Sequence, residues 1–155
     1  MFLAVVSWVV SHLESRGWLV WRSDSVGPAP IIALHPMYRT RVVVSVKKAM
    51  RSSKTPEVTI NKEEFNQLVA MCDSGPVWVM FIDAFERCIY SMNVSAYKDQ
   101  VRIERGRVYI HLGLMKYVRP LELSELRELG DVPARYACVT RFFDMVGARG
   151  GRGNL

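Results

Sequence analysis

Six basic side chains lie in one segment of the chain that has no acidic residue. Between Ser25 and Pro56 they are Arg39, Arg41, Lys47, Lys48, Arg51 and Lys54. Elsewhere the charges balance, with two of each sign in residues 1–24 and 13 of each sign in residues 57–155, so this segment holds the whole net charge of +6. Such a run can be a solvated face, but its confinement to one segment favours a surface that binds a polyanion such as nucleic acid.

The length and composition are those of one folded domain. The chain has 155 residues, of which 50% are hydrophobic, and a single core commonly holds roughly 100–200 residues. We therefore predict one α/β domain over residues 1–146. Residues 147–155 hold too many glycines to order alone, together with Arg149 and Arg152, which predicts a flexible basic tail.

The chain shows neither a targeting signal nor a cysteine framework. The apolar stretch Phe2–Val10 has no basic residue before it and no small-residue cleavage site after it, and no other apolar run approaches the roughly 20 residues of a membrane span. We expect a cytoplasmic protein without a membrane partner. Cys72, Cys88 and Cys138 are odd in number and lack C-x-x-C spacing, so we expect small buried hydrophobes and not a disulfide scaffold or a metal site.

The hydrophobic pattern predicts an α/β order of elements. Apolar residues recur at helical spacing from Leu3 to Leu13, and Gly17 ends this helix. Arg41–Lys47 is nearly continuous valine, which predicts a strand buried on both faces at the centre of a sheet. Asn61 is a plausible N-cap, with Glu64 three residues on. The other expected strands are Trp18–Arg22, Ile31–Leu34, Glu57–Ile60, Val77–Ile82, Arg87–Met92, Val101–Ile103 and Val108–Ile110, the last two joined by a hairpin turn, and two further helices are expected at Ser124–Leu129 and Pro133–Val146.

This order of elements resembles the PD-(D/E)xK nucleases and, within them, the archaeal Holliday-junction resolvases. The resemblance covers about Val5 to Leu123. It rests on four stretches, Leu13–Arg22, Gly27–Leu34, Val42–Lys47 and Val58–Phe65. It implies a restriction-endonuclease-like α/β fold, with a central mixed sheet flanked by helices.

The resemblance also implies that the catalytic motif is degenerate. The family needs an acid on its first helix, an Asp opening its second strand and an acid-x-Lys pair on its third, where period-two geometry places both side chains on one face. Here Val6, Pro30 and Ser45 stand at the three acidic positions. Only Lys47 is retained, so we expect no metal and no cofactor, and the lysine holds phosphate without generating a nucleophile.

Displaced acids are the alternative. Glu14, Asp24 and His35 lie near the expected site in sequence, and together they would give a rearranged metal centre that binds Mg²⁺. Each has a simpler explanation as a solvated or turn residue. The four tryptophans, Trp8, Trp18, Trp21 and Trp78, also have core-compatible spacing, although Trp21 lies opposite Trp18 in strand phase and is the candidate for exposure and base stacking.

Three functional hypotheses follow. The first is a noncatalytic module that holds nucleic acid, DNA in preference to RNA, through phosphate contacts from the basic segment. The second is an active structure-specific endonuclease with displaced metal ligands. The third is a structural subunit of a resolvase-like or tRNA-splicing-endonuclease-like complex. From the resemblance we also expect a homodimer, or pairing with a related catalytic subunit.

Overall fold

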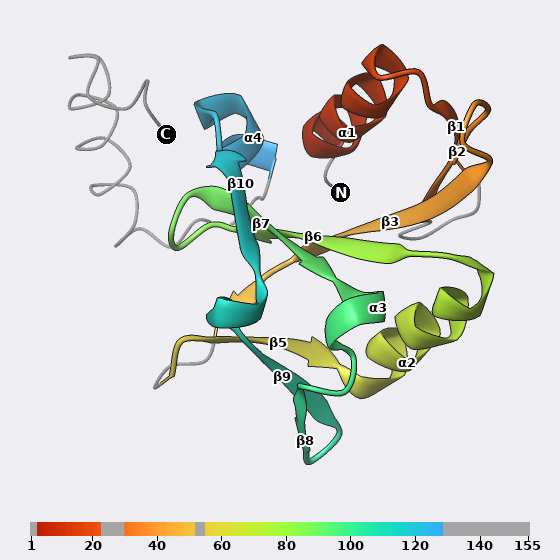
Figure 1. Ribbon diagram of the computed structural model, residues 1–155. Helices are drawn as coiled ribbons and strands as arrows, with labels where there is room; N and C mark the ends of the chain where they lie inside the picture. The colour runs from red at the N-terminus through yellow and green to blue at the C-terminus, as the bar shows by residue number, and fades with distance from the viewer. Residues whose placement is uncertain (1–2, 23–29, 52–54, 129–155) are drawn as a thin grey trace.

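The computed structural model describes residues 3–22, 30–51 and 55–128, and these form two sheets with helices around them (Figure 1). The strands are β1 (Leu19–Arg22), β2 (Ile31–His35), β3 (Thr40–Lys48), β4 (Met50–Arg51), β5 (Glu57–Asn61), β6 (Val77–Asp83), β7 (Cys88–Asn93), β8 (Arg102–Glu104), β9 (Arg107–His111) and β10 (Lys116–Pro120). The helices are α1 (Leu3–Ser15), α2 (Lys62–Met71), α3 (Val94–Tyr97) and α4 (Leu123–Glu128), with 3-10 turns at Cys72–Ser74 and Leu112–Leu114.

The larger sheet has six strands in the order β1-β2-β3-β6-β7-β10. Its strands pair antiparallel except β3 and β6, which run parallel, so the sheet is mixed. Helices α1 and α2 lie on opposite sides of it (Figure 1). The predicted central mixed sheet flanked by helices is confirmed.

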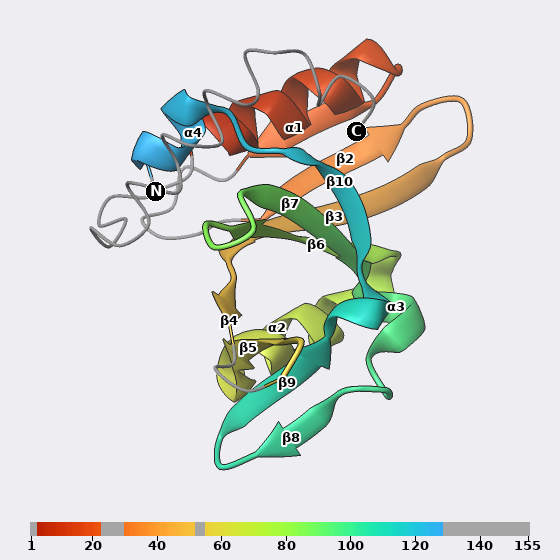
Figure 2. The same ribbon diagram turned by 90° about the vertical axis from the view of Figure 1, so that its left-hand side faces the viewer.

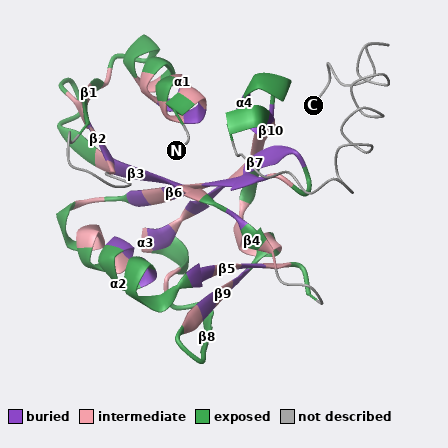
Figure 3. Ribbon diagram, turned by 180° about the vertical axis from the view of Figure 1, so that it is seen from behind, coloured by how far each residue is buried: buried purple, intermediate pink, exposed green. Residues whose placement is uncertain are grey.

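The valine strand β3 separates two apolar clusters. Residues 43–46 are buried, as predicted for a central strand, and Figure 3 shows this burial along β3 and β6. Val44 and Val46 belong to the cluster that contains Val5 and Val9 of α1. Val43 belongs instead to the cluster with the α2 side chains. Because alternate residues of a strand face opposite sides, Ser45 and Lys47 leave β3 toward α2 together with Val43.

A second sheet has four antiparallel strands in the order β4-β5-β9-β8. It lies on the α2 side of the larger sheet (Figure 2). The chain crosses from one sheet to the other at Ala49, which is buried and whose N–H donates to the carbonyl of Ile82 (2.9 Å). The strand pattern did not predict this separation into two sheets. The expected hairpin is confirmed as β8–β9, with Arg105 and Gly106 at positive φ (51° and 76°) in its turn.

The start of α2 follows the prediction. Asn61 is the N-cap, and its side-chain oxygen accepts from the N–H of Glu63 at 2.8 Å. The N–H of Lys62 donates to the carbonyl of Gly106 (3.1 Å), which fixes the beginning of α2 against the β8–β9 turn. Two residues that are 44 positions apart in sequence therefore meet at this helix terminus.

The described cysteines are structural. Cys88 is buried, and this burial raises the pKa of its thiol to about 11, so it stays protonated at neutral pH. Cys72 is half-buried and accepts from the hydroxyl of Ser95 at 3.4 Å. Cys138 lies outside the described residues. None of the described helices has the length and apolar content that a membrane crossing requires.

The end of the described chain is tied to α1. Helix α4 forms where a helix was expected, and the Glu128 carboxylate accepts from the N–H of Ala4 (3.0 and 3.2 Å). Arg119 makes two 2.7 Å hydrogen bonds to the buried Glu125 carboxylate, and its guanidinium lies over the Trp8 ring (4.3 Å to the centroid). The predicted helix Pro133–Val146 and the tail 147–155 lie outside the described residues.

The Arg119–Glu125 pair predicts an acid-sensitive component of stability. Burial raises the pKa of the Glu125 carboxyl, but the hydrogen bonds from Arg119 and the Glu122 amide and the charge of Arg119 outweigh it, so the pKa lies below the ordinary 4.5. This stabilisation is present above pH 4.5 and is lost as the pH falls through the lower native value. We expect Glu125→Gln to lower the free energy of unfolding by about 2–4 kcal/mol at pH 7. Urea denaturation at pH 7 and at pH 3 measures the difference, and an equal loss at both pH values would contradict the assignment.

Candidate functional site

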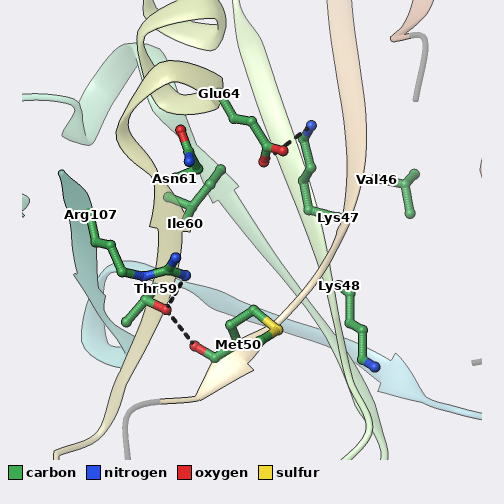
Figure 4. Close-up of a pocket in the computed structure, with 9 residues that line it drawn as sticks. All are labelled: Val46, Lys47, Lys48, Met50, Thr59, Ile60, Asn61, Glu64 and Arg107. Atoms are coloured by element: carbon green, nitrogen blue, oxygen red, sulfur yellow. Dashed lines mark hydrogen bonds and ion pairs between the residues drawn. The ribbon is translucent and has the colours of Figure 1, made fainter. Parts of the chain in front are cut away.

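A groove of about 400 Å³ opens where β3 ends, between the two sheets and the start of α2. Figure 4 shows the side chains that line it, from β3, β4, β5, α2 and β9. These are Val46, Lys47, Lys48, Met50, Thr59, Ile60, Asn61, Glu64 and Arg107. Three cations and one carboxylate therefore share this concave surface, which carries a net charge of about +2.

Lys47 is a half-buried cation of the groove. Its side chain is 15% exposed, and its ammonium Nζ lies 3.7 Å from Oε2 of Glu64, which comes from the first turn of α2 (Figure 4). The position of the ammonium follows from the alternation along β3, since Lys47 leaves the strand on the side that α2 covers. The retained lysine of the predicted motif thus lies in a groove and not at an ordinary exposed strand end.

Lys48 and Arg107 complete the set of cations. Lys48 is exposed at the end of β3. Arg107 comes from β9, where its backbone pairs with that of Asn61, and its Nη2 donates to the hydroxyl of Thr59 at 2.9 Å. Sequence reasoning missed Arg107 because residues 57–155 were counted as one window, in which 13 basic residues balance 13 acidic ones. No local signal places it there, since the β8–β9 turn pairs Arg107 with Glu104, whereas its position at the groove comes from the pairing of β9 with β5.

The structure brings together two of the three degenerate positions. Ser45 is buried and shares its side of β3 with Lys47. Ile31 pairs with Val44, so extending this register by one residue places Pro30 opposite Ser45. Val6 lies on α1 and packs with the cluster that contains Val44 and Val46, which is the opposite face of β3.

The residues at this site do not fit a divalent metal ion. Mg²⁺ takes hard oxygen ligands, usually with one or two carboxylates among them. The one carboxylate lining the groove is Glu64, which is already paired with Lys47. Within residues 3–22, 30–51 and 55–128, no three His, Cys, Asp or Glu side chains are grouped so as to hold a metal. The lining of the groove is therefore mainly cationic and lacks the oxygen ligands of a magnesium site.

The other members of the basic segment lie apart from the groove lining. Arg39 is in the β2–β3 turn at positive φ (52°), and Arg41 is exposed at the start of β3. Six residues of strand separate Arg41 from Lys47, or about 20 Å at roughly 3.3 Å per residue. Lys54 lies outside the described residues. The structure thus gathers Lys47 and Lys48, with Arg107 as a new member, and places the two arginines at the far end of the strand.

Arg51 is occupied by carboxylates of the β6–β7 turn. Its guanidinium lies 3.2 Å from Asp83 and 3.7 Å from Glu86, and 5.7 Å from the centroid of the Phe85 ring. Asp83 is fully buried and also accepts from the N–H groups of Phe85 and Glu86. Burial raises the pKa of the Asp83 carboxyl, although these amides and Arg51 act in the opposite direction. Arg51 is therefore needed at this turn to compensate a buried charge.

The described acids and aromatic residues that were considered as alternatives do not line the groove. Glu14 is exposed in the last turn of α1, and Asp24 lies outside the described residues. His35 packs against Trp18 (5.2 Å between centroids, edge-on) and Tyr38 (4.6 Å). Trp8, Trp18 and Trp78 are partly buried, whereas Trp21 is 52% exposed on the edge strand β1.

Comparison with known proteins supports the fold. The mixed sheet with helices on both faces belongs to the restriction-endonuclease-like α/β class. A solved structure of this kind is Hjc, a Holliday junction resolvase from the archaeal hyperthermophile Archaeoglobus fulgidus, with a TM-score of 0.51 over 73% of this chain and 85% of that chain. The two sequences are 16% identical, so the likeness shows the fold alone. No protein-family model and no curated protein sequence matches the chain.

The structure predicts that loss of the Arg51 side chain lowers the free energy of unfolding, whereas loss of the exposed Lys48 side chain does not. Arg51→Met removes the cation beside the buried Asp83 carboxylate and leaves it only the two amide donors. We therefore expect the free energy of unfolding at pH 7 to fall by about 2–4 kcal/mol. The deficit should shrink as the pH falls, because a protonated Asp83 needs no cation. Lys48→Met, at an exposed position, should change stability by less than about 0.5 kcal/mol. Chemical denaturation measures the free energy of unfolding of both variants. Equal decreases in the two would show that the contacts of Arg51 with Asp83 and Glu86 do not stabilise the protein.

Proposed function

We propose that this protein is a noncatalytic nucleic-acid-binding protein that holds the phosphate backbone in the groove at the end of β3. The observation that carries the proposal is that Lys47, Lys48 and Arg107, which come from two different strands, all line one concave site whose lining holds a single carboxylate. Hjc, whose fold this chain shares, is a Holliday junction resolvase. This supports nucleic acid as the polyanion, and DNA in preference to RNA.

The groove suits phosphate and not the edges of bases. Lysine and arginine neutralise phosphates and release counterions, which gives affinity without sequence preference. Arg107 offers a planar guanidinium held by Thr59, and Lys48 a mobile ammonium. The apolar residues Ile60 and Met50 also line the groove, and a hydrocarbon surface reads no hydrogen-bond pattern.

The missing carboxylates support a binding role without cleavage. Val6, Pro30 and Ser45 provide no ligand for a metal, and a lysine alone neither binds a metal nor lowers the pKa of a water molecule. The alternative of displaced ligands would need Glu14, Asp24 or His35 at the groove; Glu14 and His35 do not line it, and Asp24 lies outside the described residues. Pairing with a second copy or with a related subunit remains a prediction, for which the exposed edge strand β1, with Leu19 and Trp21, offers an apolar surface.

Salt-dependent binding tests the groove. Each phosphate contact adds about 0.9 to the magnitude of the slope of log K against log salt on B-form DNA, so three cations predict a slope of roughly −3. The double variant Lys47→Ala, Lys48→Ala should weaken binding to all sequences alike and reduce this magnitude by about two. Fluorescence anisotropy on labelled duplex, four-way-junction and single-stranded DNA, and on RNA, measures both quantities.

The matched control removes the same net charge elsewhere. Arg16→Ala with Lys116→Ala changes exposed cations of α1's C-terminal end and of β10, neither of which lines the groove. We expect this control to keep the wild-type slope. Equal losses from the two double variants would mean that net charge, and not the groove, drives association.

The noncatalytic assignment predicts that the protein leaves its ligand intact. Four-way junctions and duplex DNA are incubated with excess protein at several concentrations of Mg²⁺ or Mn²⁺. Denaturing gels should show no cleavage above that of a protein-free control. The expected reason is the absence of carboxylates at positions 6, 30 and 45. Cleavage that requires the metal and disappears on Glu14→Ala, Asp24→Ala or Glu64→Ala would instead establish a displaced metal centre.

A further inference from the structure

Glu64 is the one anionic side chain in the lining of an otherwise cationic groove. Its Oε2 lies 3.7 Å from Nζ of Lys47, and Figure 4 shows the two side chains directed toward each other. The carboxylate therefore occupies one of the positions beside the Lys47 ammonium that an anionic ligand would take. Its neighbour Glu63 is also exposed in the first turn of α2 but does not line the groove.

We propose that Glu64 is a built-in competitor, whose carboxylate takes the place of a backbone phosphate on Lys47 and must be displaced when nucleic acid enters the groove. This inference rests on the proposed function and assigns its phosphate subsite to Lys47. It also gives the groove a preference for polymers that carry several phosphates over small anions.

The pair has the properties of a contact that can open. Charge-assisted hydrogen bonds between nitrogen and oxygen are typically about 2.7–2.9 Å long, so the 3.7 Å separation is an ion pair without a direct short bond. The Glu64 side chain is 48% exposed, whereas that of Lys47 is 15% exposed. Rotation of Glu64 into solvent thus leaves the lysine in place and costs little, since pairs at this exposure contribute weakly.

A backbone phosphate can engage more of the groove than Glu64 does. Among the described contacts, the Glu64 carboxylate pairs with Lys47 alone, while Lys48 and Arg107 also line the groove. Consecutive phosphates of one strand can meet several of these cations and displace Glu64 through their combined attraction. A single small anion gains only one such contact and competes with a carboxylate that is permanently tethered at high effective concentration.

The simpler explanation is that Glu64 serves only the helix. An acid in the first turn of α2 interacts favourably with the helix macrodipole, and Glu63 has the same charge one residue earlier. Glu63→Gln is therefore a matched control, because it removes an equal charge from the same helical turn without touching Lys47. Gln is itself accepted at such positions, so both variants should fold.

The experiment compares the two variants in binding labelled duplex DNA at one fixed salt concentration. We expect Glu64→Gln to bind about three- to tenfold more tightly than wild type and Glu63→Gln less than about twofold more tightly, because only the first frees Lys47. In a Lys47→Met background, Glu64→Gln should have no more effect than Glu63→Gln. Inorganic phosphate should compete better against the Glu64→Gln complex than against the wild-type complex.

The outcomes separate this inference from the proposed function. If wild type binds through Lys47 and the two glutamine variants gain equally, the competitor role is overturned and the function stands. If wild type fails to bind DNA but Glu64→Gln binds it, the competitor role is supported, because the Glu64 carboxylate alone then prevents phosphate from reaching Lys47. If neither protein binds nucleic acid at any salt concentration, both proposals are overturned, since releasing Lys47 then creates no site.

Discussion

The packing of β3 between two apolar clusters is the constraint on which the rest of the molecule depends. Val44 and Val46 pack with α1, and Val43 packs with α2, so the strand cannot rotate or slip by one residue without exposing one set. The parallel pairing with β6 extends this register through Lys48. The direction of Lys47 is therefore a consequence of the core packing of β3 on both of its faces.

Spatial arrangement, and not the local balance of charge along the chain, decides which cations are available. Arg51 belongs to the basic segment, yet two carboxylates from the β6–β7 turn surround it. Arg107 belongs to residues 57–155, whose charges balance as a whole, yet β9 places it in the lining of the groove. A charge count by sequence window detects the excess but not its distribution, because β-strand pairing brings together residues from distant windows. Arg102 illustrates this, as it is paired with Glu57 from β5, 45 residues away.

The parts of the fold that follow from local pattern were predictable. The central valine strand, the Asn61 cap and the β8–β9 hairpin each depend on residues within a few positions of one another. The split into two sheets depends on the crossing at Ala49 and on the pairing of β5 with β9, about 50 residues apart, which no local pattern encodes. The groove lies at this split. Lys47 could be proposed from its strand, whereas Glu64 as its partner required the position of α2.

Burial explains why β3 accommodates a lysine at position 47 but would be destabilised by an uncompensated carboxylate at position 45. Ser45 is 4% exposed, and a carboxylate at such a position is costly unless a metal ion or a cation compensates its desolvation. Acidic side chains that hold a metal therefore depend on that metal, and without it a small hydroxyl or an apolar residue gives the more stable fold. Lys47 lies on the same side of the strand but two residues nearer the opening, where Glu64 neutralises it. The lysine is thus compatible with a folded protein whether or not an anion is bound, because the chain itself supplies the compensating charge.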